Sequence, residues 1–241
     1  MGVEHADPPS LAGAPAEEIL AWADAEYGNS AAIASSFGVE DVVLIDLASR
    51  HAPRLGVFTL DTGRLPPETY DAMEQVRRRY GIRIETYFPD RAAVEALENE
   101  KGFFSFRRSV EERKECCAIR KLEPLSRALK GKKAWVTGLR REQSVTRADV
   151  EVVEVDQAHG GIVKLNPLAG WTEAQVWRYA RDRSLPVNAL HERGYPSIGC
   201  APCTRAVAPG EDVRAGRWWW ESPEHKECGL HLSSAPKAGD R

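Results

Sequence analysis

Five cysteines are the residues of this sequence best suited to chemistry, and four of them form two close pairs. Cys116 and Cys117 are adjacent, Cys200 and Cys203 form a Cys-x-x-Cys motif, and Cys228 stands alone near the carboxyl end. Cysteines grouped in this way favour metal binding or catalysis over disulfides. Four thiolates can complete the ligand set of one zinc ion or of one [4Fe–4S] cluster.

The adjacent pair Cys116 and Cys117 bears on the kind of metal centre. Neighbouring side chains normally diverge, so both can serve one centre only with a special backbone or a large centre. An iron–sulfur cubane accommodates adjacent ligands more readily than a single zinc ion does. We therefore expect a cluster. A structural zinc ion, a redox pair at Cys200 and Cys203, and inert buried cysteines remain open as alternatives.

Basic residues gather beside the cysteines and in several loops. Any one of them is best explained as a solvated surface side chain, but together they indicate a small, strongly anionic substrate. These residues are Arg107, Arg108, Arg120, Lys121, Arg140, Arg141, Arg147, Arg214 and Arg217.

Alternating strands and helices must position these residues. Apolar runs predict strands at residues 31–34, 55–60, 82–87 and 134–137, and helical spacing predicts helices at 16–27, 41–49, 67–80 and 91–99. Two further strands, 152–155 and 162–165, are expected to pair around a Gly-Gly turn. This alternation predicts an α/β fold with a doubly wound, mostly parallel sheet.

Two turns at strand ends are suited to bind a nucleotide. The segment from Ser35 to Asp41 joins a strand to a helix, where backbone N–H groups and the helix dipole favour anions. It lacks the Lys-Ser/Thr of a Walker loop, which argues against a P-loop NTPase. Asp61-Thr62-Gly63 follows the next strand, so both turns would lie at the carboxyl edge where open sheets bind ligands.

Composition and patterning define the setting. The 241 residues carry a formal net charge of -3 and are 42% hydrophobic, which argues against nucleic acid or membrane as the main partner. No apolar stretch reaches the roughly 18–20 residues of a membrane span, and no secretory signal is recognisable. We expect a cytoplasmic protein with a flexible leader at 1–14, an α/β domain at 15–204 and a C-terminal segment at 205–241.

Several motifs occur in the order of one family. They are Ser36-Phe37-Gly38, Leu60-Asp61-Thr62-Gly63, Cys116-Cys117 with Arg120-Lys121, Cys200-Ala201-Pro202-Cys203-Thr204-Arg205, the run from Arg214 to Glu221, and Glu227-Cys228-Gly229-Leu230-His231. Over about residues 30–232 the chain resembles the iron–sulfur branch of the adenylyl-sulfate (APS) reductases of sulfate assimilation and cysteine biosynthesis, relatives of the phosphoadenylyl-sulfate (PAPS) reductases.

The resemblance implies a fold of the adenine-nucleotide α-hydrolase-like type and assigns roles to residues. Cys116, Cys117, Cys200 and Cys203 would hold a [4Fe–4S] cluster, and Cys228, on an irregular C-terminal flap, would be the catalytic nucleophile. Residues expected to bind substrate are Ser36, Leu60, Gly63, Lys121, Arg147, Arg214, Arg217 and His231.

The expected reaction is the thioredoxin-dependent reduction of APS to sulfite and AMP through an S-sulfocysteine on Cys228. Thioredoxin or a similar dithiol would be the protein partner, and a homo-oligomer is left open. Alternatives are a PAPS or dual-specificity reductase, a zinc-stabilised nucleotide-binding regulator without catalysis, and an ATP-using enzyme of the same superfamily.

Overall fold

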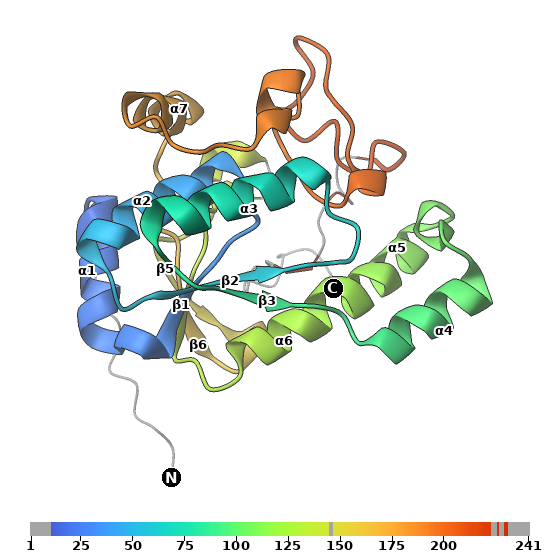
Figure 1. Ribbon diagram of the computed structural model, residues 1–241, viewed down its shortest axis with the longest axis horizontal. Helices are drawn as coiled ribbons and strands as arrows, with labels where there is room; N and C mark the ends of the chain where they lie inside the picture. The colour runs from blue at the N-terminus through green and yellow to red at the C-terminus, as the bar shows by residue number, and fades with distance from the viewer. Residues whose placement is uncertain (1–10, 145–146, 223–225, 227–228, 231–241) are drawn as a thin grey trace, which may run out of the picture.

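A six-stranded sheet forms the centre of the molecule, in the order β3-β2-β1-β4-β6-β5 (Figure 1). The computed structural model describes residues 11–144, 147–222, 226 and 229–230. The strands are β1 (Ala31–Ala34), β2 (Gly56–Leu60), β3 (Ile84–Tyr87), β4 (Ala134–Val136), β5 (Val153–Asp156) and β6 (Ile162–Leu165).

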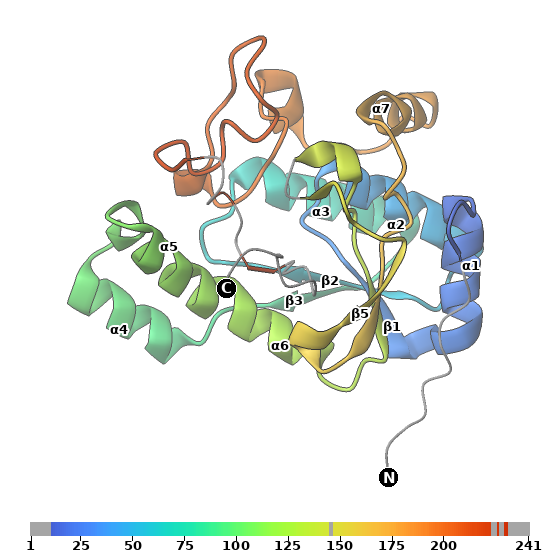
Figure 2. The ribbon, with the colours of Figure 1, turned by 180° about the vertical axis from the view of Figure 1, so that it is seen from behind.

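All neighbouring strands run parallel except β5, which pairs antiparallel with β6 at one edge. Figure 2 shows this edge from behind. The mostly parallel sheet and the pairing of its last two strands are therefore confirmed. Such sheets bury both faces under helices, which explains why the central strands β1 and β4 are apolar throughout.

Helices cover the two faces of the sheet (Figures 1 and 2). They are α1 (Ala16–Tyr27), α2 (Val39–His51), α3 (Pro67–Tyr80), α4 (Arg91–Lys101), α5 (Val110–Cys117), α6 (Glu123–Leu129) and α7 (Glu173–Asp182). The first four match the expected helices, with α2 starting two residues earlier. The last three were not expected. Charged residues dominate α5, whereas α6 and α7 carry apolar residues at helical spacing, Leu125 with Leu129 and Val176 with Ala180, that were not recognised.

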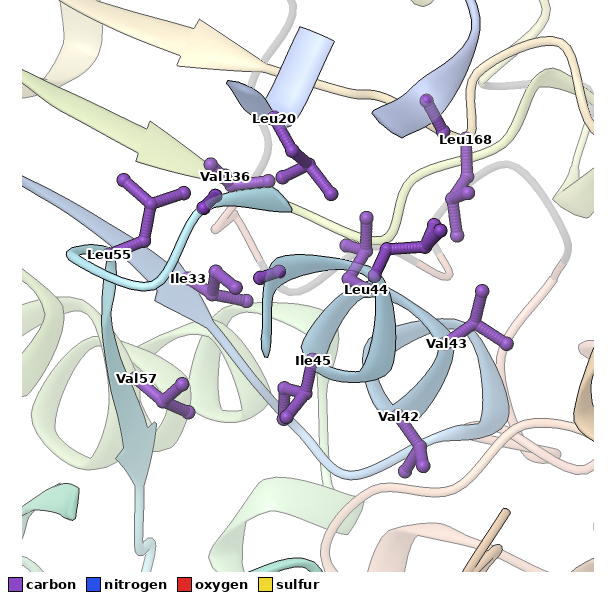
Figure 3. Close-up of a cluster of buried hydrophobic side chains, with 14 of the residues drawn as sticks. Leu20, Ile33, Val42, Val43, Leu44, Ile45, Leu55, Val57, Val136 and Leu168 are labelled. Carbon is purple, nitrogen blue, oxygen red and sulfur yellow. The ribbon is translucent and has the colours of Figure 1, made fainter. Parts of the chain in front are cut away.

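The main core lies between β1 and the helices on one face (Figure 3). Ile33 of β1, Leu44 of α2 and Leu20 of α1 are fully buried there, and Val136 of β4 joins them. The small residues of β1, chiefly alanine, allow the helices to approach the sheet closely. This packing fixes the start of α2 against the end of β4.

The strand order creates a switch point between β1 and β4. From β1 the chain crosses through α2 to β2 on one side, while β4 pairs with β1 on the other side. The crossovers on either side diverge, leaving a crevice at the carboxyl ends of the strands.

The segment that follows α7 contains short 3-10 turns at Ala189–Arg193 and Ala201–Cys203 and then a folded loop. An isolated bridge joins Thr204 to Arg217, and the loop buries Trp218 while Trp219 stays 39% exposed. None of the described helices is long and apolar enough to cross a membrane.

Candidate active site

A cavity of about 230 Å³ opens at the carboxyl ends of β1, β2 and β4, at the switch point of the sheet. Its walls come from the loops after these strands, from α7 and from the C-terminal segment. Six of the residues expected to bind substrate line it: Ser36, Leu60, Lys121, Arg147, Arg214 and Arg217. Segments far apart in the sequence thus converge on one pocket.

The turn after β1 is tightly organised around Asp41. Ser36 donates to Asp41 Oδ2 through its backbone N–H at 2.6 Å and through its hydroxyl at 2.8 Å. Phe37 has a φ of 59°, a left-handed conformation that is rare for an aromatic residue. Its fully buried side chain holds the turn in place. Strained turns of this kind cluster at functional sites.

Acidic residues occupy the first turn of α2 beside the cavity. Burial raises the pKa of Asp41 to about 6, although the hydrogen bonds from Ser36 oppose the shift. Glu40 accepts from Arg140 Nε at 3.0 Å and from the Gln143 amide at 3.0 Å. The charge of Arg140 is therefore compensated inside the protein, and the helix start already holds anionic groups of its own.

Arg217 presents a buried cation to the cavity. Its side chain is 7% exposed, lies 4.6 Å from the Trp218 ring and donates to the Ile198 carbonyl at 3.3 Å. Within the described ranges it has no carboxylate partner, and its Nε has no hydrogen-bond partner. A buried guanidinium without a counter-charge is costly. The site therefore favours an anion beside Arg217.

The residues around Cys228 in the sequence also reach this site. Arg214 donates to the Lys226 carbonyl at 2.6 Å, and the Lys226 ammonium donates to the Ala215 carbonyl at 3.3 Å. Leu230 lines the cavity, and Gly229 lies against Leu122. Cys228 and His231 themselves lie outside the described residues.

All four paired cysteines line a second, smaller cavity. Its other walls are Phe106, Trp218 and four basic side chains: Arg64, Arg113, Arg120 and Lys121. Lys121, Cys200 and Trp218 line both cavities. The cysteine cavity and the strand-end cavity are therefore direct neighbours separated by these three side chains.

A π-helical turn (Ala118–Leu122) follows Cys117 directly and links α5 to α6. Pro124 has no N–H for the α-helical bond to residue 120, so the regular hydrogen-bond ladder breaks here. The turn carries Arg120 and Lys121 toward the cysteines. The adjacent cysteines were expected to need a special backbone or a large metal centre, and this irregular turn begins directly after them. Such π-helical turns are frequent at functional sites.

The basic walls act strongly on the thiols. Burial would raise the pKa of Cys200, but Lys121, a 3.2 Å hydrogen bond with Thr62, and Arg217 together lower it. Burial and the neighbouring Cys200 raise the pKa of Cys203 to about 12. Thiolates here need cations or a metal, and metal binding would release protons.

The donor set fits a tetrathiolate metal centre. Four cysteines surround one cavity, and basic side chains balance the negative charge that such a centre carries. As they stand, the described His, Cys, Asp and Glu side chains form no group of three arranged to hold a single metal ion. The fit therefore rests on the chemistry of the four donors and the shared cavity.

One residue expected in the site lies outside its lining, and several residues of the site were not expected. Gly63 does not belong to the described lining of the strand-end cavity; its N–H donates to Asp61 Oδ1 at 2.8 Å. Thr62 was quoted in a motif, but its bond to Cys200 was not expected. Glu98 pairs with both Arg64 and Arg120, and Arg113 pairs with Glu221. Such pairs between distant elements leave no spacing signal in the sequence.

Known proteins match this chain over most of its length. Residues 30–206 match the phosphoadenosine phosphosulfate reductase domain family. The protein named adenosine 5′-phosphosulfate reductase of Allochromatium vinosum is 56% identical over 203 residues, covering 84% of this chain and 79% of the relative. A protein of the same name from Burkholderia cepacia is 56% identical over 201 residues, covering 83% and 80%.

Solved structures agree with these matches. The phosphoadenylyl-sulfate reductase of Candida auris superposes with a TM-score of 0.69 at 30% identity, covering 82% of this chain and 93% of that one. The FMN adenylyltransferase of Candida glabrata superposes with a TM-score of 0.54 at 16% identity, covering 88% and 72%, and shows the fold alone.

Fold and site together define an α/β enzyme with a thiol-lined cavity beside a larger cavity at the carboxyl ends of its strands. The chain belongs to the phosphoadenosine phosphosulfate reductase domain family. Within that family its sequence lies beside the adenosine 5′-phosphosulfate reductases. The expected fold type and the expected resemblance are thereby confirmed.

Proposed function

We propose that this enzyme reduces APS to sulfite and AMP in sulfate assimilation and cysteine biosynthesis, with electrons from thioredoxin or a similar dithiol. The observation that carries the proposal is the buried Arg217 guanidinium, which faces the strand-end cavity without a carboxylate partner among the described residues. The cavity adjoins the cysteines, and relatives that are 56% identical bear the name of this activity.

In the first step, the Cys228 thiolate attacks the sulfur of the bound sulfate group. A new S–S bond forms while the bond between that sulfur and the bridging oxygen breaks. The electron pair of the broken bond leaves with AMP, whose phosphate is a good leaving group. The product is an S-sulfocysteine on Cys228.

In the second step, a thiolate of the dithiol partner attacks the Cys228 sulfur. Sulfite leaves with the electron pair of the S–S bond, and a mixed disulfide joins the two proteins. The second thiol of the partner then displaces Cys228. The dithiol is oxidised to a disulfide, two protons are released, and the sulfate sulfur is reduced to sulfite.

Basic residues have two tasks in this scheme. Arg217 and Lys121 bind the anionic oxygens around the reacting sulfur, and cations near Cys228 favour its thiolate form. Arg214 acts on the same region through the Lys226 carbonyl, at 2.6 Å. Arg147 and the Ser36 turn bind the nucleotide, Leu60 faces the adenosine, and His231 acts close to the nucleophile.

Cys116, Cys117, Cys200 and Cys203 would hold a [4Fe–4S] cluster in the second cavity. When bound, it supplies a charged centre that shapes the electrostatic potential beside Lys121 and Cys200. Thr62 orients Cys200, at 3.2 Å. Because the dithiol supplies both electrons, the scheme needs no electron from the metal centre.

The C-terminal segment from residue 205 is proposed to act as a flap. Cys228 must meet a small bound nucleotide and then a protein dithiol, and one rigid position serves both poorly. The cytoplasmic compartment remains a prediction from the sequence.

The test measures sulfite released from APS and from PAPS by anaerobically purified protein with thioredoxin. The Cys228→Ser variant is the matched control. Sulfite from APS alone, lost in the variant, supports the proposal. Release from PAPS at an equal or higher rate assigns the enzyme to the PAPS or dual-specificity alternative. Release from neither nucleotide, by protein that contains zinc, overturns the enzymatic scheme.

A further inference from the structure

A buried ion pair joins the cysteine-bearing helix to the C-terminal segment. Arg113 Nε and Nη2 donate to the two carboxylate oxygens of Glu221 at 2.8 and 2.9 Å. The two side chains are only 1% and 3% exposed, although the residues are 108 positions apart. Such a fork-to-fork pair fixes both position and orientation.

Each partner sits where its placement matters. Arg113 lies one helical turn before Cys117 on α5. Burial lowers the pKa of Arg113, but Glu221 and, after it, the Cys117 thiol outweigh burial and raise it. Glu221 closes a turn by donating its N–H to the Trp218 carbonyl at 2.8 Å. Glu221 is also the acidic residue that precedes the chain leading to Cys228.

Trp218 connects this ion pair to the strand-end cavity. Its ring lies 4.7 Å from the Arg113 guanidinium and 4.6 Å from that of Arg217. It lines both cavities, is 1% exposed and has a φ of 40°. A bulky residue keeps this strained conformation only when its surroundings over-determine it.

Stability alone does not explain the pair. Two apolar side chains of similar volume would fill the same space without the desolvation cost of two charges. Conformational specificity is one reason for retaining buried charged pairs. Here the position that would be specified is that of the Trp218–Glu221 turn relative to α5.

We propose that Arg113 and Glu221 are positioning residues that couple the cysteine cavity to the C-terminal segment. The pair holds the Trp218–Glu221 turn so that Arg217 faces the substrate cavity and the chain toward Cys228 starts beside the cysteines. Because Arg113 lies on the same helix as Cys116 and Cys117, removing the metal from the cysteine cavity weakens the ion pair between Arg113 and Glu221. The coupling to catalysis rests on the proposed function, but the anchoring does not.

The first experiment compares Glu221→Gln with the wild type by limited trypsin digestion. The readout is cleavage after Lys226, whose carbonyl and ammonium are held by Arg214 and Ala215. We expect Glu221→Gln to keep its iron and sulfide content but to be cleaved about 5-fold faster, as expected for a local opening that costs less free energy. The control is Asp24→Asn, which breaks the remote pair with Arg54 and should leave cleavage unchanged.

The second arm removes the metal from the wild type by anaerobic chelation. Cleavage after Lys226 should rise to the rate of Glu221→Gln, and Glu221→Gln should show little further increase. An unchanged rate in the stripped wild type contradicts the coupling. Arg113→Lys, which keeps the charge but loses the fork, should give an intermediate rate.

A third variant controls for the possibility that the single substitutions unfold the protein. The double variant Arg113→Met with Glu221→Met keeps the volume of the pair without its charges and should fold. Cleavage at the wild-type rate in this folded variant overturns the proposal. Turnover is a separate readout: Glu221→Gln should lower kcat more than it changes KM. If Glu221→Gln is cleaved faster than the wild type but no form, the wild type included, is active, the proposed function fails and the anchoring stands.

Discussion

Arg217 differs from most basic side chains of this chain in how its charge is compensated. Arg54, Arg64, Arg113 and Arg140 are each paired with a carboxylate. Arg217 is buried beside Trp218 and faces the cavity without such a partner among the described residues. A bound anion would offset the cost of burying this charge, so a substitution of Arg217 tests the proposed anion site directly.

Replacing Arg217 with Met should lower kcat/KM for APS and weaken AMP binding. Removal of a charge-assisted hydrogen bond costs about 1.5–3 kcal/mol, which corresponds to roughly 10–150-fold. Steady-state kinetics and calorimetric titration with AMP measure the two effects. Arg91→Met, at an exposed position, is the control. Equal kcat/KM values in the Arg217 variant and the wild type would contradict an anion site here.

Asp41 should make stability depend on pH in an unusual direction. Its folded carboxyl has a pKa of about 6, because burial raises it from 3.8. Between these values the folded state binds more protons than the unfolded state, so stability falls as pH rises through this window, by about 3 kcal/mol. Urea unfolding at pH 4.5 and 7.5 measures the effect. As pH rises, the unfolding free energy of Asp41→Asn should increase relative to that of the wild type.

The control for this pH dependence is Asp71→Asn, at an exposed position of α3. Its stability should follow the wild type at both pH values. Parallel profiles for Asp41→Asn and the wild type would show that Asp41 titrates normally in the folded protein.

At the scale of elements, the site depends on the close approach of β4 and α2. Gly138 follows β4 at the switch point, and a Cβ there would collide with the Asp41 carboxylate and lie 3.0 Å from Glu40 Cβ. Only glycine therefore lets the loop after β4 reach the start of α2. The close contact holds both rims of the strand-end cavity in place.

Gly138→Ala should destabilise the protein and weaken AMP binding, because the loop or the helix must move. We expect a loss of about 1–3 kcal/mol in unfolding free energy, the usual cost of overpacking. Gly56→Ala in β2 is the matched control, since its Cβ would meet nothing closer than 3.9 Å. Denaturant unfolding of both variants measures the loss of stability, and AMP titration measures the loss of binding. Equal effects of the two substitutions would contradict the close-approach explanation.

At the scale of the whole molecule, the cysteine cavity joins parts of the chain that are far apart in sequence. Helices α4 and α5, the π-helical turn and the 200–221 region all contribute to its walls or to the charges behind them. Four basic side chains line the cavity beside the thiols, and carboxylates pair with three of them. A metal centre held by the four cysteines would cross-link α5 to the 200–203 region and so stabilise the fold.

Removing the metal should therefore lower the thermal stability of the entire domain. Each 1 kcal/mol lost corresponds to about 2–4 °C in Tm for a chain of this size. Calorimetry of anaerobic, metal-loaded protein and of chelated protein measures the shift. The Cys203→Ser variant should resemble the chelated form in both Tm and colour. A Tm independent of metal content would contradict a structural contribution of this centre.

Local patterns in the sequence were sufficient to predict the strands and the first four helices. The metal-binding role of the cysteines stays a prediction. Alternation of short apolar runs with amphipathic segments predicts a parallel sheet, because only crossover helices can connect such strands. The turns after β1 and β2 could be located for the same reason, since they end predicted strands. Four clustered thiols with basic neighbours predicted a metal site before any contact was known.

Contacts between distant segments were decided by the tertiary structure alone. The π-helical turn at Ala118–Leu122 and the charged helix α5 depend on packing that no local apolar period reveals. The apolar residues of α6 and α7 do recur at helical spacing, so these two helices could have been predicted from the sequence. The pairing of Arg113 with Glu221, and of Glu98 with two arginines, spans separations at which sequence carries no spacing rule. Residue types and local order thus determined the chemistry, whereas burial and long-range packing determined which charges the fold compensates and which, as at Arg217, it leaves for a ligand.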